Sequence, residues 1–259
     1  MKSLIPFITL SIILLFNTSC EDFNEIVLDR TQVLESIEVD FEPVNSYIYN
    51  EKERISRINT YSQFSSSLIY YSIYEHGKDT ITVNLINNSN EITIRSQKIY
   101  HVDRKTVRRD IYGVNGAELL EYRLYRYNGN SCGYSEIEIY DPNSVLTLRT
   151  TYAYYNINCS QDIHNYNAND SLLSRIRIER DEKQPYFAST VLDIFKQGNV
   201  GNITEYTYMD ADSMVNQDLS YYIDYQYNNF DNGNYPIVEN KYYRNGDFED
   251  RKFIYVGVQ

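Results

Sequence analysis

Closely spaced turn signals divide most of this chain into short segments, and their spacing limits the folds open to it. From Tyr47 onwards, clusters of Asn, Gly, Asp and Ser interrupt stretches of roughly five to nine residues in which tyrosine and aliphatic residues alternate with polar ones. Such stretches have the two-residue period of a β-strand, and turns this frequent leave no room for helical crossovers between parallel strands. The spacing therefore predicts antiparallel hairpins and meanders.

The pattern places most of the elements along the chain. The clearest strands are expected at residues 91–95, 122–127, 136–140, 144–155, 174–180, 203–209, 221–227 and 251–256. Turns are expected at residues 75–78, 87–90, 128–130, 141–143, 199–202, 231–234 and 244–247. The opening stretch, residues 31–41, has the apolar spacing of both a short helix and a strand, and both stay open.

Tyrosine dominates the composition, with 28 tyrosines and no tryptophan among 259 residues. Such residues favour strands and keep a polar tip at the surface. In residues 174–180, arginine and glutamate alternate with isoleucine, so one face of that strand is expected to be solvated. In residues 122–127, large side chains fall on both faces, which suits a strand covered on both sides. The predicted fold class is all-β, an antiparallel meander of repeated β-hairpins forming an extended sheet or a sandwich.

The N-terminus has the pattern of an export signal. Lys2 gives a positive start, and residues 4–16 form an apolar run of signal-peptide length. A membrane-spanning helix needs about 20 apolar residues, so this run is interpreted as a leader and not as an anchor. The small residues before Cys20 resemble a bacterial lipoprotein signal, in which that cysteine becomes the first mature residue and carries the lipid. An ordinary secretory peptide cut near Ser19 is the alternative.

Acidic residues follow the candidate lipidation site. Glu21 and Asp22 come directly after Cys20 and resemble the surface-export signal of Bacteroidetes-type lipoproteins. The resemblance implies an outer-membrane protein that is lipid-anchored through Cys20 and faces the cell exterior. The expected domains are a lipoprotein signal peptide over residues 1–19, the lipidated cysteine and a tether over residues 20–35, and a tyrosine-rich β-repeat domain over residues 36–259.

A loose repeat runs along the predicted domain. Residues 47–58 contain alternating tyrosine or apolar residues, a polar turn and alternating isoleucines, which is the pattern of one hairpin. Related units occur at residues 70–77, 192–206 and 242–255. These units resemble tyrosine-aspartate (YD, or RHS-like) repeats, and more closely the Bacteroidetes lipoproteins of unknown function that are built from degenerate versions of them. The resemblance covers most of residues 47–259 and implies an extended array of β-hairpins.

Two cysteines remain after Cys20. Cys132 and Cys159 could pair in an oxidising compartment, and closing a loop of that length would contribute about 3 kcal/mol in the chain-entropy model. The spacing alone leaves this pairing open. The three histidines are isolated and no Cys or His pair has zinc-ligand spacing, so neither a metal site nor a cofactor is predicted.

Enzyme signatures are mostly absent from the sequence. Residues 133–137 begin like a nucleophile elbow but lack its final glycine and precede a strand. Asp210 and Asp212, with Asp193, could form a carboxylate pair for glycoside hydrolysis, but such residues are far commoner as solvated charge. The chain is therefore predicted not to be an enzyme. Its net charge of −12 repels a phosphate backbone, which excludes nucleic acid as a partner.

The tyrosines give the functional lead. Rows of rings on a sheet face can contact a protein or stack on sugars, although cross-strand packing accounts for most such rings. The predicted function is a non-catalytic cell-surface lipoprotein acting as a binding or structural module of the envelope. Its partners would be the membrane, through the N-terminal lipid, and an envelope protein or a glycan. Glycan capture as an accessory protein of a nutrient-uptake system is the alternative, and a secreted hydrolase is a third hypothesis.

Overall fold

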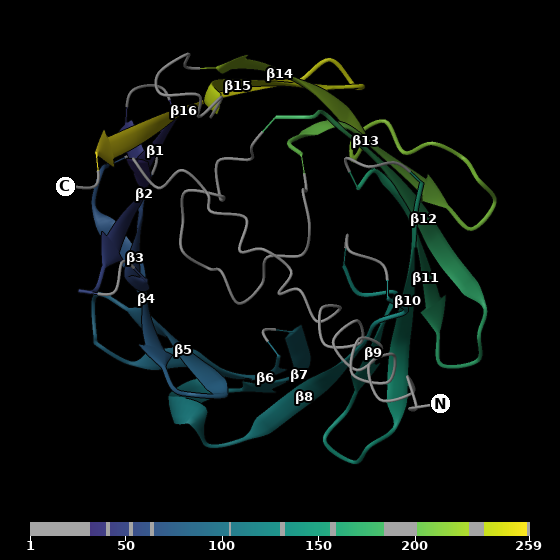
Figure 1. Cartoon of the computed structure of the whole chain (residues 1–259), viewed down its shortest axis with the longest axis horizontal. Coiled ribbons are helices and arrows are strands. Elements are labelled where there is room, and N and C mark those ends of the chain that lie inside the picture. The colour runs from purple at the N-terminus through teal and green to yellow at the C-terminus, as the bar shows by residue number, and fades with distance from the viewer. Residues whose placement is uncertain are drawn as a thin grey trace, which may run out of the picture. The chain divides into compact units, whose positions relative to one another are not determined.

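The computed structural model contains a β-barrel, seen end-on in Figure 1. The chain divides into two compact units, Met1–Arg30 and Thr31–Gln259, and the barrel belongs to the second. The structure describes residues 32–39, 42–51, 54–62, 65–103, 105–129, 133–155, 159–183, 201–227 and 236–257. The predicted leader and Cys20 lie outside these ranges.

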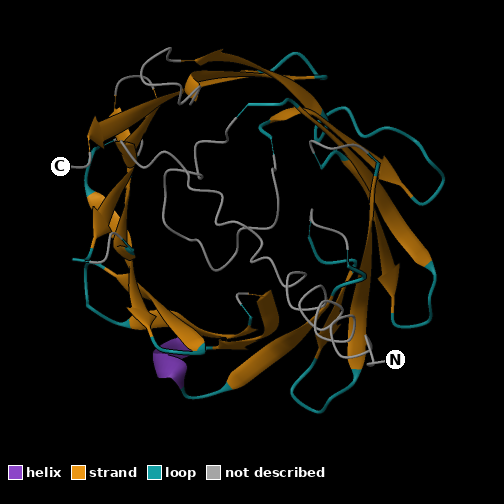
Figure 2. Cartoon of the chain, in the orientation of Figure 1, coloured by secondary structure: helices purple, strands orange, loops and turns teal. Residues whose placement is uncertain are grey.

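In the described part of the chain, sixteen strands form the wall of the barrel. They are β1 (Gln32–Val39), β2 (Glu42–Tyr49), β3 (Ile55–Tyr61), β4 (Leu68–His76), β5 (Thr80–Asn87), β6 (Thr93–Val102), β7 (Lys105–Tyr112), β8 (Leu119–Arg126), β9 (Glu136–Tyr140), β10 (Leu146–Tyr154), β11 (Gln161–Asn167), β12 (Leu172–Arg180), β13 (Ile203–Asp210), β14 (Tyr221–Tyr227), β15 (Pro236–Tyr243) and β16 (Phe248–Gly257). Figure 2 shows this wall of strands, and a short 3-10 helix, η1 (Val114–Gly116), lies in the connection between β7 and β8.

The sheet closes on itself. Each strand pairs antiparallel with the next along the chain, and β1 pairs with β16. Ile37 lies opposite Phe253 in the closing pair, and Val44, Tyr47 and Tyr255 pack against these two buried side chains. The chain is all-β, but the expected extended sheet or sandwich is wrong, because the strands form one closed barrel. Closure pairs the two strands that an open sheet of the same order would leave as exposed edges.

The alternating sequence pattern predicted the positions of several strands correctly. β9 and β14 have the bounds expected from the sequence, and the ambiguous opening stretch contains strand β1. The expected strand at residues 91–95 begins later, at Thr93 in β6. The side chains of Asn87 and Asn90 accept hydrogen bonds from the backbone N–H groups of Ser89 and Ile92, which extends the turn.

Three hairpins at one end of the barrel, β9–β10, β11–β12 and β13–β14, use the same turn. In each, an Asp or Asn side-chain oxygen accepts hydrogen bonds from the backbone N–H groups two and four residues later, over 2.8 to 3.0 Å. The residues that supply this oxygen are Asp141, Asn167 and Asp210. The fourth residue of each turn has a left-handed φ of 60° to 65°, at Ser144, Asp170 and Ser213. The turns at Asp141 and Asn167 connect the paired strands of their hairpins directly, whereas the turn at Asp210 closes a bridge between Met209 and Val215 that precedes β14.

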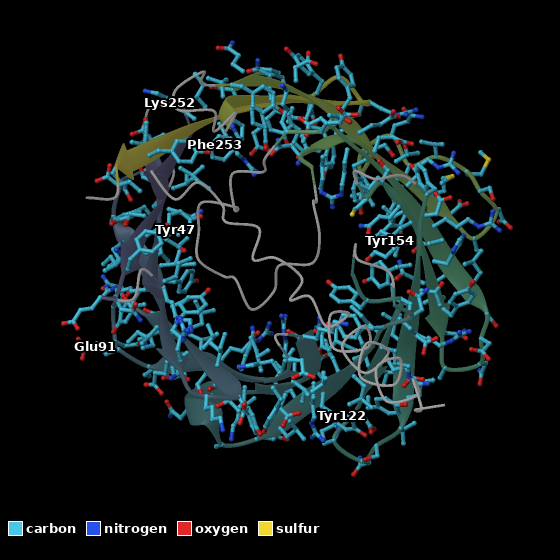
Figure 3. All side chains as sticks on the ribbon, viewed as in Figure 1. Tyr47, Glu91, Tyr122, Tyr154, Lys252 and Phe253 are labelled. Atoms are coloured by element: carbon cyan, nitrogen blue, oxygen red, sulfur yellow. The ribbon has the colours of Figure 1, made fainter. Side chains whose placement is uncertain are left out.

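The wall has two distinct faces, because successive residues of a strand point to opposite sides. Figure 3 shows Tyr47, Tyr154 and Phe253 directed into the ring and Lys252 directed away from it. Residues directly opposite each other on neighbouring strands share a face, so the pairing around the ring extends this assignment to every strand. The face that contains Phe253 is called the inner face below, and the face that contains Lys252 the outer face.

We expect Ile81→Ala to destabilise the barrel by about 2 to 5 kcal/mol, since a buried aliphatic side chain would be replaced by a cavity. Ile81 is 1% exposed and lies opposite Ile99 on the inner face. The matched control is Ile48→Ala, because Ile48 is 46% exposed on the outer face, and its change should not exceed about 0.5 kcal/mol. Chemical denaturation followed by circular dichroism measures both free energies. Equal effects of the two substitutions would contradict the assignment of the faces.

Candidate functional site: the inner face of the barrel

The outer face carries charged side chains that are paired with one another. Arg126 on β8 donates to Glu138 on β9 over 2.8 Å. On β7, Arg108 Nε donates to Asp110 over 2.6 Å, and the hydroxyl of Tyr100 on β6 donates to the same carboxylate over 3.2 Å. Asp110 is only 4% exposed, so its charge is compensated by these donors as burial requires. These outward charges are therefore neutralised by neighbouring side chains of the wall.

Arginine side chains also cover tyrosine rings on the outer face. Three guanidinium carbons lie 3.9 to 4.7 Å from ring centres, in the pairs Arg57 over Tyr71, Arg108 over Tyr122 and Arg149 over Tyr166. A barrel that faces lipid needs a continuous apolar band about 25 Å tall, within which an Arg or Lys at the midplane costs about 2–4 kcal/mol. Because the outer face instead presents charged groups from strand after strand, it is suited to contact with water.

The inner face carries a cluster of tyrosines near β8, β9 and β10. The ring of Tyr134 meets the rings of Tyr125, Tyr152 and Tyr127 edge-on, with centroid separations of 5.3, 5.1 and 6.2 Å. The hydroxyl of Tyr154 donates to the backbone carbonyl of Tyr134 over 3.2 Å. Burial raises the pKa of Tyr134, Tyr152 and Tyr154. These hydroxyls therefore stay protonated at neutral pH. The five residues are called the tyrosine cluster below.

A buried carboxylate lies on the opposite part of the inner face. Glu239 on β15 is 5% exposed, accepts a hydrogen bond from the Tyr225 hydroxyl over 3.3 Å and lies 3.7 Å from Arg251 Nη1. Arg251 also lies 2.6 Å from Glu249 on its own strand, so one arginine serves two carboxylates. Burial raises the pKa of Glu239, while the positive charge of Arg251 acts in the opposite direction.

Beside this carboxylate, a lysine lies between aromatic rings. Lys241 Nζ is 4.0 Å from the ring centre of Tyr221 and 4.6 Å from that of Tyr243. Tyr221 also stacks on Tyr206, with ring centroids 4.9 Å apart. Burial raises the pKa of Tyr221 to about 12. This part of the inner face therefore offers a cation and several hydroxyl donors side by side.

The other part of the wall contains further inward arginines, among them Arg109, Arg123 and Arg180. Arg109 and Arg123 lie directly opposite each other on β7 and β8, and Arg123 donates twice to Glu121, over 2.8 and 2.6 Å. Arg180 ends β12, and its Nη1 donates to the carbonyl of Gly201 over 2.9 Å. Burial lowers the pKa of Arg180, as expected for a cation removed from water. Guanidinium and phenol groups together make the inner face suited to polar or anionic solutes.

The cysteines singled out from the sequence are only partly described. Cys20 and Cys132 lie outside the described residues. Cys159 is 2% exposed and disulfide-bonded. Its pairing with Cys132 stays a prediction, as does lipidation of Cys20.

Of the acidic residues considered for hydrolysis, Asp210 and Asp212 lie in a turn. Asp210 Oδ1 accepts hydrogen bonds from the backbone N–H groups of Asp212 and Met214 and so belongs to a turn. Asp193 lies outside the described residues. The carboxylates brought together on the inner face, Glu239 and Glu249, are instead paired with an arginine.

Metal-ligating groups are not gathered in the described part of the chain, where no set of three or more His, Cys, Asp or Glu side chains could hold a metal ion. His76 Nε2 lies 2.8 Å from the carbonyl oxygen of Ile55, and His101 Nε2 lies 3.0 Å from that of Lys78, so these rings serve the backbone. Within the described ranges, none of the helices is long and apolar enough to cross a membrane.

Sequence reasoning missed the inward charged residues. Arg109 stands between Arg108 and Asp110, and a run of charge usually marks a solvated surface. The available signal was its two-residue spacing from Ile111, which is buried on the same face. That signal could not be used until the inner face was known.

The fold is similar to that of two porin-like proteins of known crystal structure. The protein from Bacteroides vulgatus ATCC 8482 is 11% identical with a TM-score of 0.54, over 88% of this chain and 100% of that one. The protein from Bacteroides uniformis ATCC 8492 is 12% identical with a TM-score of 0.57, over 87% of this chain and 96% of that one. No protein-family model and no curated protein matches the sequence. The likeness defines the fold as a porin-like β-barrel.

These findings correct two predictions. The resemblance to YD or RHS-like repeats is wrong, because the fold is a porin-like barrel. The repeated tyrosines reflect the two-residue period of a wall that uses this residue on both faces, as with Tyr122 outside and Tyr125 inside. The predicted function as an envelope binding or structural module, with glycan capture as its alternative, is also wrong, because the chain forms a closed barrel similar to the porin-like proteins.

We expect Glu239→Gln to make the barrel more stable than the wild type at neutral pH. A carboxyl whose pKa is raised on folding loses its stabilising contribution as pH rises through that folded-state pKa. The difference in thermal midpoint should therefore close as pH falls towards the ordinary pKa of glutamate. Glu205→Gln on the outer face, where the side chain is 43% exposed, is the control for the same chemical change at an exposed position, and it should not make the barrel more stable than the wild type at neutral pH. A wild type that is more stable than Glu239→Gln at neutral pH would argue against this assignment.

Proposed function

We propose that this chain is a porin-like barrel of the outer membrane that admits small polar solutes to its inner face. The contrast between the two faces carries the proposal. Paired charges and arginine-covered rings make the outer face compatible with water, while the inner face gathers tyrosine hydroxyls and cationic groups. Barrels of 16 strands are wide enough to leave an aqueous interior, and Figure 3 gives the view along it.

The outer-membrane location is supported by the porin-like fold and by the export leader. We further propose that a lipid on Cys20 holds the barrel at the membrane surface. Burying charged residues of the outer face in lipid would cost free energy. Acyl chains on one cysteine would instead anchor the protein while the barrel wall stays outside the lipid. The membrane is then contacted through the N-terminus and not through the wall.

Catalysis forms no part of this proposal. Porin-like barrels are typically non-catalytic, and the inward groups of this chain suit binding and passage of solutes. Because a fold hosts many functions, the absence of an enzymatic activity in this chain stays a prediction.

We expect a small thiol reagent, but not a polymer-linked one, to label the Ser72→Cys variant. Ser72 lies on the inner face, opposite Ile58 and Leu85, whereas the neighbouring Ile73 lies on the outer face. N-ethylmaleimide should add one label to both the Ser72→Cys and Ile73→Cys variants, relative to the wild type. A maleimide on a long polyethylene glycol should label only Ile73→Cys. If N-ethylmaleimide does not label Ser72→Cys, the proposed access of solutes to the inner face is wrong.

A second prediction separates a tethered barrel from an immersed one. In a bacterial host that processes lipoproteins, Cys20→Ser should move the folded protein from the membrane fraction to the soluble fraction without detergent. Ser19→Ala is the control and should leave the protein in the membrane fraction, since it keeps the cysteine and a small residue before it. If the Cys20→Ser protein stays in the membrane fraction and needs detergent for extraction, the barrel wall itself is embedded in the lipid.

A further inference from the structure

The inner face contains a like-charge pair. Arg109 on β7 and Arg123 on β8 are directly opposite each other across the strand pair. Like charges in this position destabilise a sheet unless counter-charge is supplied. Glu121 supplies it for Arg123, through two hydrogen bonds to one carboxylate oxygen.

Arg109 has no such partner in the described part of the chain. Its Nε is buried, makes no hydrogen bond and belongs to none of the ion pairs found there. A buried donor without an acceptor costs stability, and a charged one costs more. The neighbouring residue Arg108, which points outwards, is by contrast held by Asp110.

Arg109 lies within electrostatic reach of two inward tyrosines, Tyr74 and Tyr134. The positive charge of Arg109 acts against the burial that raises the pKa of Tyr74 on β4 and of Tyr134 in the tyrosine cluster. Arg180 acts on Tyr134 in the same way. The phenol of Tyr134 therefore lies within electrostatic reach of two inward arginines. Flat rings and guanidinium groups together form the surroundings that a planar anion requires.

The sign of this charge is opposite to that of the whole chain, which carries a net charge of −12. A general excess of acidic residues gives solubility without any need for local cations. Among the described residues, the opposed pair Arg109 and Arg123 has one inward carboxylate partner, Glu121, so this part of the inner face favours an anionic ligand. Guanidinium groups bind carboxylate and phosphate oxygens with two parallel hydrogen bonds.

We propose that Arg109, supported by Arg123 and the tyrosine cluster, binds the oxyanion group of a small organic solute with a planar body. The oxyanion takes the unpaired guanidinium of Arg109, and the planar body packs against Tyr134 and Tyr152. This inference rests on the proposed access of solutes to the inner face. It adds the chemical class of the solute.

Benzoate, phenyl phosphate and neutral benzamide are the probes for this site, because they share a flat ring and differ in charge. Isothermal titration at constant ionic strength should detect benzoate or phenyl phosphate and not benzamide. The anion that binds more tightly shows whether the site prefers a carboxylate or a phosphate. Arg109→Gln should weaken binding at least about tenfold, the loss expected for one charge-assisted contact. Arg57→Gln, which removes the same charge from the outer face, should bind like the wild type.

A stability measurement separates a binding role from a structural one. Without any probe, Arg109→Gln should unfold at the same or a higher temperature than the wild type, because the repulsion from Arg123 is relieved. A clear loss of stability in Arg109→Gln would indicate that Arg109 stabilises the fold. In that case Arg109→Lys, which keeps the charge, would be titrated in place of Arg109→Gln. Its affinity should then be weaker than that of the wild type but still measurable.

Two results would overturn the inference. One is equal binding of benzamide and benzoate, and the other is anion binding that Arg109→Gln and Arg109→Lys leave unchanged. Labelling of Ser72→Cys by the small maleimide together with no anion binding would defeat this inference alone. No labelling of Ser72→Cys would defeat the proposed solute access as well.

Discussion

Pairing of the first strand with the last is the interaction on which the rest of the structure depends. The backbone bonds between β1 and β16 leave no free edge on either strand, and the contact between Ile37 and Phe253 packs the join. Before closure the sheet has two equivalent sides. After closure one side faces an interior and the other faces the surroundings, so every alternating residue acquires a different environment.

Tyrosine is the residue that allows both sides of this wall to be built from one pattern. On the outer face, rings lie beneath arginines, as Tyr71 does beneath Arg57, so apolar area is covered while polar tips stay in water. On the inner face, rings pack against one another around Tyr134. A wall with lipid outside would instead need isoleucine, leucine and valine in the outward positions.

Charge is distributed unequally between the faces. Several outward charges have partners on the wall, and even the buried Asp110 has an arginine and a tyrosine as donors. Inward charges are less completely matched, with Arg109 the clearest case in the described residues. Stability alone would favour replacing such a group by an apolar one. Its presence among tyrosines is the feature of the inner face that points most directly to a solute.

The sequence by itself determined the local structure. Alternation and turn residues located strands such as β9 and β14, and the turn beginning at Asp141 follows from its own side chain. Closure was decided only in three dimensions, because the pairing of β1 with β16 joins opposite ends of the chain and leaves no local signal. The same is true of the site. Arg108 and Arg109 look alike in sequence, and only the closed ring places the first on the outer face and the second on the inner face.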